Sequence, residues 1–145
     1  MINSQSYMPQ SKSVEWSTPQ VLFDKYHDIY KYSLDVCATK ENTKCSRYYT
    51  IDDDGLSKPW AGNCWCNPPY GRGINKWVEK AVCSDCFITM LLPARTCTRW
   101  FHNYIYCKPD VEIEFLKGRL KYGDSKTAAP FPSMIVNIGV SHANK

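Results

Sequence analysis

The chain has 145 residues, of which 43% are hydrophobic and 22% are charged, and its formal net charge is +4. This length and composition fit one globular domain with a single core and exclude two full domains. The mild positive charge favours an anionic partner, although many unrelated proteins share it. The longest apolar run, Cys86 to Leu92, is far shorter than the roughly 20 residues that span a bilayer, so no membrane segment is expected.

Polar tails are predicted at both ends of the chain. Residues 1–13 are polar and show no periodicity, so we expect a flexible tail there, followed by one domain over 14–141 and a short tail at 142–145. The N-terminal stretch MINSQSYMPQSKSVEW contains no apolar signal core, which predicts an intracellular protein.

The eight cysteines are expected to be reduced thiols, since intracellular chains keep few disulfides. Cys64 and Cys66 form a C-x-C pattern, and Cys83 and Cys86 form a C-x2-C pattern, so a zinc site has to be considered. Both pairs fall in or beside predicted strands, where cysteine behaves as a small hydrophobic residue. We therefore expect no metal.

Helix and strand patterns alternate along the first half of the domain. Ser17-Thr18-Pro19 places a capping hydroxyl beside a proline suited to a first helical turn, and apolar residues then recur at helical spacing. Short apolar runs bounded by turn signals predict strands. In order, we expect a helix carrying Leu22 to Tyr30, a strand at 32–36, a short helix at 38–45, a strand at 47–50, an acidic turn at 52–55 and a strand at 63–66.

The second half contains the strongest helical stripe of the chain. Its apolar residues recur from Ile74 to Val82 at helical spacing, which places Trp77 in the core. The remaining expected elements are a buried strand at 86–92, a helix capped by Thr98, a half-buried strand at 111–115 and a closing antiparallel pair formed by 118–123 and 134–140. This alternation predicts an α/β fold with a mainly parallel sheet covered on both faces.

The stretch CWCNPPYGRG stops a strand with two prolines. Because proline cannot donate to a sheet ladder, the strand must end at about Asn67, at the edge where open α/β sheets bind ligands. The Asn67 amide oxygen and the main-chain carbonyl of Pro68 can each accept one N–H of a planar amine such as that of adenine. The prolines, Pro68 and Pro69, hold these acceptors rigidly, and Tyr70 can stack on the base. A Pro-Pro turn followed by a packed tyrosine is the alternative.

NPPY resembles the [DNS]PP[YFW] motif of amino-methyltransferases. From Trp16 to about Gly139 the chain resembles the small phage-type, Dam-like DNA N6-adenine methyltransferases through WSTPQ, LDVCATKENTKC, YYTIDDDGL, CNPPYG, LLPARTCTRWFH, GRLKY and AAPFPS, in the family's order. The resemblance implies a minimal Rossmann-like class I fold and a cytoplasmic enzyme of phage or prophage origin. It also implies methyl transfer from S-adenosylmethionine to the N6 amino group of adenine in DNA, with the base flipped into the NPPY pocket.

The resemblance also implies contacts to the methyl donor. Trp16, Thr18 and Pro19 match the N-terminal motif that lines the methionine end of the donor, and a helix cap with a packed tryptophan is the alternative. Asp54 matches the contact to the donor's adenine amino group. Another aspartate of the 52–54 turn is a second candidate for that role, and a simple acidic turn is the structural alternative.

The loop after the first strand departs from the broader methyltransferase pattern. Asp35, at the strand end, is expected near the donor's ammonium or ribose, and a turn aspartate is the alternative. The sequence DVCATKEN contains no glycine, although a glycine-rich turn usually lets the backbone approach the donor here. Small Cys37 and Ala38 would then have to provide the clearance.

Two arginines are candidate DNA contacts. Arg95 follows the strand at 86–92 and matches a position that reaches a phosphate or the target strand, with a surface salt bridge as an equal alternative. Arg119 lies in a basic segment, which is read equally well as a solvated hairpin. RNA or protein-glutamine methylation and a non-catalytic nucleic-acid-binding remnant are the alternative functions. A homodimer would supply further DNA surface, and the sequence does not decide whether one forms.

Overall fold

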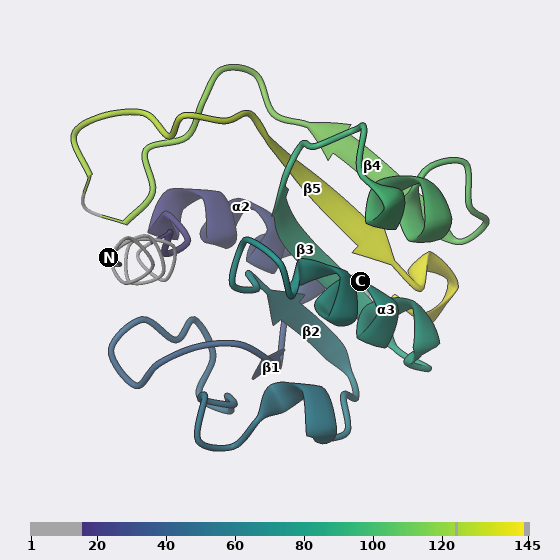
Figure 1. Cartoon of the computed structure of the whole chain (residues 1–145). Helices are drawn as coiled ribbons and strands as arrows, with labels where there is room; N and C mark the ends of the chain where they lie inside the picture. The colour runs from purple at the N-terminus through teal and green to yellow at the C-terminus, as the bar shows by residue number, and fades with distance from the viewer. Residues whose placement is uncertain (1–15, 124, 144–145) are drawn as a thin grey trace, which may run out of the picture.

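The computed structural model describes residues 16–123 and 125–143, and in them strands and helices alternate (Figure 1). The α-helices and strands are α2 (Gln20–Tyr30), β1 (Leu34–Asp35), β2 (Asn63–Cys66), α3 (Ile74–Cys83), β3 (Phe87–Pro93), β4 (Val111–Phe115) and β5 (Ser133–Ile138). Short helical segments are η1 (Gly55–Ser57), η2 (Phe101–Ile105) and η3 (Val140–His142). The predicted α/β class is confirmed.

The strands form a five-stranded sheet in the order β1-β2-β3-β5-β4. Strands β1, β2 and β3 run parallel, and β5 runs antiparallel to both β3 and β4. It follows that β4 points in the same direction as β1 to β3. The loops after β1, β2, β3 and β4 therefore leave the sheet at one common edge, where ligands bind in open α/β sheets.

The predicted antiparallel pairing of 134–140 with 118–123 was wrong. Strand β5 pairs with β3 and β4, whereas the segment 118–123 forms no strand. Gly118 and Gly123 both have positive φ, of 74° and 56°, which bends the segment out of an extended path. Between them, Tyr122 is 2% exposed, so the basic segment is tied to the core by a buried aromatic residue.

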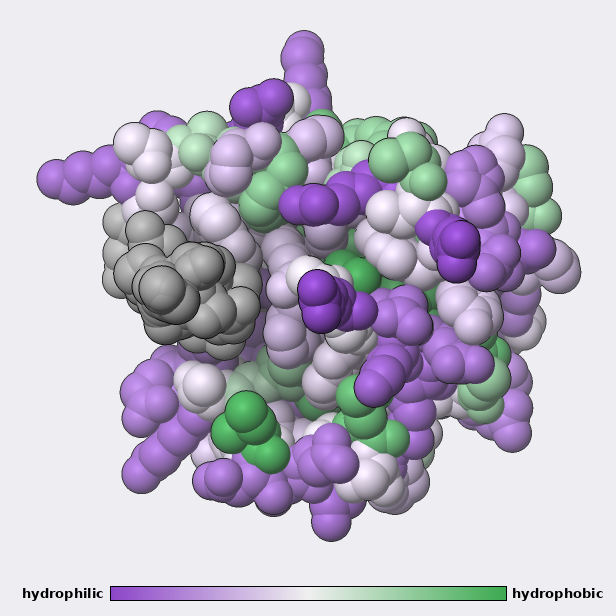
Figure 2. All heavy atoms as spheres, in the orientation of Figure 1, coloured by the Kyte–Doolittle hydropathy of each residue, from purple (hydrophilic) through white to green (hydrophobic). Residues whose placement is uncertain are grey.

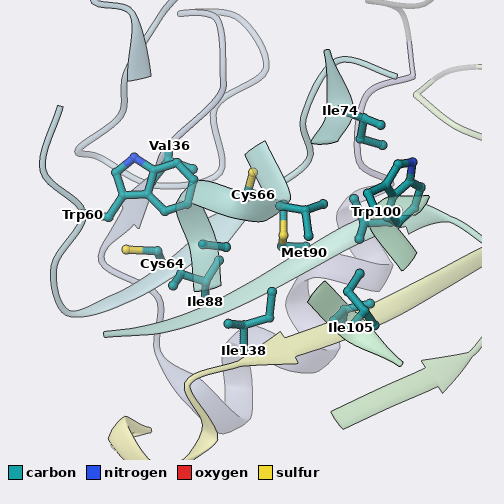
Figure 3. Packing of buried hydrophobic residues seen from close by; sticks show 14 of the residues in the cluster. Val36, Trp60, Cys64, Cys66, Ile74, Ile88, Met90, Trp100, Ile105 and Ile138 are labelled. Atoms are coloured by element: carbon teal, nitrogen blue, oxygen red, sulfur yellow. The ribbon is translucent and has the colours of Figure 1, made fainter. Parts of the chain in front are cut away.

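Alternate strand residues pack against opposite faces of the sheet, as the pleat requires. Cys66 of β2 belongs to a core cluster with Val78 of α3, whereas its neighbour Trp65 belongs to a second cluster with Phe23 of α2. Helices α2 and α3 therefore cover opposite faces, and α3 lies in front of the sheet in Figure 1. Figure 3 shows the α3-side cluster, in which residues of β2, β3 and β5 lie between Trp60 and Trp100.

Three local predictions need correction. The segment 38–45 is a turn and not a helix. Thr39 and Asn42 exchange hydrogen bonds between side chains and backbone N–H groups, as at a helix start, but the backbone bond from Thr43 to Thr39 closes a single turn that does not continue. The strand expected at 47–50 is reduced to one bridge between Asp35 and Tyr48. The N-cap of α2 is Pro19, with no side-chain capping bond, so the hydroxyl of the preceding threonine does not cap the helix.

Polar side chains cover most of the face shown in Figure 2, and apolar side chains appear there in small separate groups. Among residues 16–123 and 125–143, no helix is long and apolar enough to cross a membrane. In the same residues no three His, Cys, Asp or Glu side chains are grouped as a metal site would need. All eight cysteines lie within this part and are free thiols.

Candidate active site

A cavity of about 460 Å³ opens at the carboxyl edge of β1 and β2. This volume lies within the range of small-molecule sites in proteins. Three stretches supply most of its wall, namely 16–18 before α2, 35–42 after β1 and 49–55 around the acidic turn. The end of β2 contributes Asn67, Pro68 and Pro69, so the motif predicted to hold the amine forms part of the same wall.

The amide of Asn67 is held on one side only. Its Nδ2 donates to the main-chain carbonyl of Trp16, at 2.6 Å, and to Oγ1 of Thr18, at 3.1 Å. Its Oδ1 is buried and has no hydrogen-bond partner among the described residues. A buried acceptor without a partner costs about 1–3 kcal/mol, so such an atom on a residue that lines a cavity points to a ligand that donates to it.

Tyr70 packs beside the cavity and does not line it. Its hydroxyl donates to the carbonyl of Leu91, at 3.0 Å, and lies 3.3 Å from the hydroxyl of Tyr122. Its ring meets Tyr122 and Phe131 edge to face. Burial and the nearby Tyr122 hold the pKa of Tyr70 well above its ordinary value, so the hydroxyl stays protonated. The ring is therefore fixed by its far end.

Asp35 lies at the end of β1, is 3% exposed and lines the cavity. Its carboxylate accepts hydrogen bonds from the backbone N–H groups of Lys44, at 3.0 Å, and Cys37, at 3.4 Å. Burial raises the pKa of Asp35 to about 7, against these two bonds, which lower it. A carboxylate in this position changes charge close to neutral pH.

The other predicted donor contacts divide into two groups. Trp16, Thr18, Ala38 and Asp54 all line the cavity. Pro19 does not line it, and its carbonyl accepts the backbone N–H of the fourth residue after it, as expected at a helix start. The structure thus brings four of these residues together and leaves the proline as a helix cap.

The two arginines predicted to contact DNA lie outside the cavity. Arg95 follows β3 and Arg119 follows β4, and both side chains are exposed. Among the described residues, Lys25 and Glu114 form an ion pair, at 3.9 Å, and Arg95 forms none. Because β2, β3 and β4 are parallel to one another, both arginines lie on loops at the edge that carries the cavity.

A family model described as DNA N-6-adenine-methyltransferase (Dam) matches residues 5–137. The chain belongs to the Dam family. It is 33% identical over 93 residues to the DNA N-6-adenine-methyltransferase of Haemophilus phage HP1 (strain HP1c1). The aligned region covers 59% of this chain and 53% of that protein. It is 37% identical over 92 residues to the protein of the same name from Escherichia phage T1, over 59% of this chain and 38% of that protein. The chain thus spans about half the length of one relative and less of the other.

In this Dam-family chain, Gly55 is a residue whose importance the sequence did not reveal. A Cβ at this position would lie 2.3 Å from the carbonyl oxygen of Val36 and 3.3 Å from the ring of Trp77. The stretch DVCATKEN after β1 contains no glycine, and the close backbone approach at the end of β1 is made by Gly55, the first residue of η1. Trp77, predicted as core, packs against the core and also lines the cavity. In the sequence, the DGL segment was the signal that could have drawn attention to Gly55.

Proposed function

We propose that this chain transfers a methyl group from S-adenosylmethionine to the N6 amino group of adenine in DNA. The observation that carries the proposal is the buried Oδ1 of Asn67, an acceptor without a partner among the described residues, on a side chain that lines a cavity of small-molecule size. Membership of the Dam family and the names of the two phage relatives support it. We also propose that the sheet is a minimal Rossmann-like class I methyltransferase fold within one domain over 14–141.

The Asn67 oxygen and the Pro68 carbonyl would each accept one N–H of the target amine. An aromatic amine is a poor nucleophile because its lone pair is delocalised into the ring, and two fixed acceptors draw the nitrogen toward tetrahedral geometry. Pro68 is buried and its ring fixes the backbone torsion, which holds its carbonyl in place. Tyr70, whose hydroxyl is anchored on Leu91, would keep its ring in position for the base to stack, a contact worth about 1–3 kcal/mol.

The cavity residues fit a cationic methyl donor with polar groups at both ends. Asp35 would accept the donor's ammonium or ribose hydroxyls, and Asp54 would accept its adenine amino group. Trp16, Thr18 and Ala38 would line the space between these groups and the amine pocket. When bound, the donor supplies an electrophilic methyl group for in-line attack. The protein's contribution is then mainly the positioning of the two reactants in one place.

The raised pKa of Asp35 predicts a pH dependence of donor binding. With a pKa of about 7, the carboxylate gains a proton between pH 7.5 and pH 5.5 and loses its attraction for a cation. We expect the Kd of S-adenosylmethionine, measured by calorimetry, to rise on the order of tenfold over this range. The thiols of Cys37 and Cys45 do not titrate in it, because burial and Asp35 raise the pKa of each to about 12.

The matched variant for this effect is Asp35→Asn, which cannot titrate. We expect it to bind the donor weakly at both pH values, so that its Kd changes less than threefold. A wild-type Kd that is constant between pH 5.5 and pH 7.5 would contradict the assignment of this carboxylate to the donor.

Three loops at the cavity edge would contact the phosphates of DNA. The loops 67–73, 94–99 and 116–132 contain seven lysines and arginines and one acidic residue in sequence, whereas the whole chain has 18 basic and 14 acidic residues. All seven basic side chains are exposed, namely Arg72, Arg95, Arg99, Lys117, Arg119, Lys121 and Lys126. An adenine inside a duplex would have to leave the stack to reach Asn67, at a cost of a few kcal/mol. Phosphate contacts around the pocket supply binding energy that offsets this cost.

Phosphate contacts predict a specific effect of salt. Arg95→Ala and Arg119→Ala should each weaken DNA binding to the same extent for every sequence and reduce the slope of log K against log salt by about 0.9. Fluorescence anisotropy with labelled DNA at several salt concentrations measures both quantities. Lys108→Ala, which removes an exposed charge after η2 at the opposite edge, is the control and should leave the slope unchanged. A slope unaltered in both arginine variants would contradict this surface.

The proposed function is tested by offering methyl-labelled S-adenosylmethionine together with unmethylated DNA, RNA or protein extract. We expect label in the DNA. Label in RNA or protein alone would replace the proposed substrate, and donor binding without any transfer to the three acceptors would contradict the enzymatic function.

A further inference from the structure

Both hydrogens of the Asn67 amide are already in use. The Nδ2 group has two N–H donors, and the structure gives it two acceptors, the Trp16 carbonyl at 2.6 Å and the Thr18 hydroxyl at 3.1 Å. A carbonyl oxygen can only accept, so the opposite orientation would place Oδ1 against a second acceptor at the same distance. The orientation of the amide is thus fixed by the chemistry of its neighbours.

The two acceptors are themselves held in place. Thr18 is 6% exposed, and its Oγ1 also accepts the indole N–H of the fully buried Trp65, at 3.3 Å. Both lone pairs of that hydroxyl are therefore occupied by groups that only donate. The ring of Trp16 meets the rings of Tyr122 and Phe131 edge to face, with centroids 5.5 and 5.2 Å away.

A backbone bond fastens the same segment to the basic loop. The N–H of Gly123 donates to the carbonyl of Ser17, at 2.8 Å, between the two residues that hold Asn67. The stretch 16–18 is thus fixed by contacts to the 116–132 loop and to β2. The Asn67 amide, although it lies in a loop, is therefore held by two fixed acceptors.

We propose that the main-chain carbonyl of Trp16 and the hydroxyl of Thr18 are a positioning clamp that occupies both N–H groups of the Asn67 amide and holds its oxygen, which has no partner among the described residues, for the target amine. The inference rests on the proposed function and deepens it. The clamped side chain can accept a hydrogen bond and can donate none. It therefore favours a base that carries an amino group over one that presents a carbonyl at the same place.

The clamp also makes asparagine and aspartate unequal at position 67, although the motif allows both. An ionised aspartate would bring an oxygen to the Trp16 carbonyl, where only a donor fits. A protonated aspartate could donate to that carbonyl and keep the other oxygen free. Asn67→Asp should therefore have a methylation rate at least tenfold below wild type at pH 8. The rate of Asn67→Asp divided by the wild-type rate should rise as the pH falls to 6.

Thr18 is tested by a pair of substitutions. Thr18→Val keeps the shape and removes the acceptor, and we expect a single-turnover methylation rate about tenfold lower. Thr18→Ser keeps the hydroxyl and should recover most of this loss. Because Thr18 also lines the donor cavity, donor Kd is measured on the same proteins and each rate is taken at saturating donor, so that the remaining loss reports amine positioning and not donor binding.

A measurement that does not depend on activity completes the test. In ¹⁵N-labelled protein, the two side-chain amide protons of Asn67 should exchange slowly with solvent, and Thr18→Val should accelerate the exchange. Fast exchange of both protons in wild type would overturn the clamp, as would wild-type rates in Thr18→Val or an Asn67→Asp to wild-type rate ratio that stays constant with pH. Slow exchange in a protein that methylates no DNA would contradict the proposed function and leave the clamp itself in place.

Discussion

Replacing Asn67 with alanine is expected to lower the rate of methyl transfer by about 10²- to 10³-fold, which is the usual loss when one preorganised hydrogen-bonding group is removed from a reacting centre. The side chain supplies the buried Oδ1 that the described residues leave without a partner. Its loss removes one of the two acceptors that prepare the amine for attack. Single-turnover kinetics with labelled donor measures the effect directly.

The fold should survive this substitution. Asn67→Ala removes two hydrogen bonds from Nδ2 and also removes the unpartnered oxygen, so the stability cost is about 1–2 kcal/mol. The control is Asn103→Ala, the same chemical change at an exposed position beside a second hollow at the opposite edge of the sheet. A folded Asn67→Ala protein with a rate within threefold of wild type would contradict the proposed role of Asn67 in preparing the amine for attack.

Replacing Gly55 with alanine is expected to destabilise the protein by about 2–4 kcal/mol, through overpacking against backbone. The added Cβ would lie 2.3 Å from the Val36 carbonyl oxygen, and a main-chain atom cannot move aside as a flexible side chain can. Relief of the clash would separate the acidic turn from the end of β1. Since both segments line the cavity, affinity for the donor should fall as well.

Gly73→Ala provides the matched control for this prediction. Residue 73 has φ of −86°, at the N-cap of α3, and an added Cβ would meet nothing within 4 Å. Its unfolding midpoint in urea should stay close to that of wild type, with a cost below about 1 kcal/mol. Equal midpoints for Gly55→Ala and Gly73→Ala would show that the close approach at the end of β1 is not required.

Elements with a strong local pattern are predictable from the sequence. Strand β2 lies at the predicted residues 63–66, because the prolines after Asn67 define its end. The apolar stripe predicts α3, and the alternation of apolar and acidic residues predicts β4 at 111–115. The capping role of Thr98 is also confirmed, since its Oγ1 accepts the N–H of Phe101, at 3.4 Å.

Features that depend on distant residues are not predictable in this way. The carbonyl of Trp16 that holds Asn67 comes from 51 positions earlier in the chain, and main-chain groups leave no mark in a sequence pattern. Tyr122 looks like part of a solvated basic segment until its hydroxyl is seen 2.6 Å from Ser133 in the core. Similarly, Gly55 reads as a turn signal until its distance to Val36 is known.

The most direct test of the account is the chemical position of the transferred methyl group. Purified protein is incubated with methyl-labelled S-adenosylmethionine and unmethylated DNA, the DNA is digested to nucleosides, and the products are separated and weighed by mass spectrometry. We expect label in N6-methyl-2′-deoxyadenosine for wild type and a loss of that product in Asn67→Ala. Label on another atom, or equal amounts of N6-methyl-2′-deoxyadenosine from both proteins, would contradict the proposed role of Asn67.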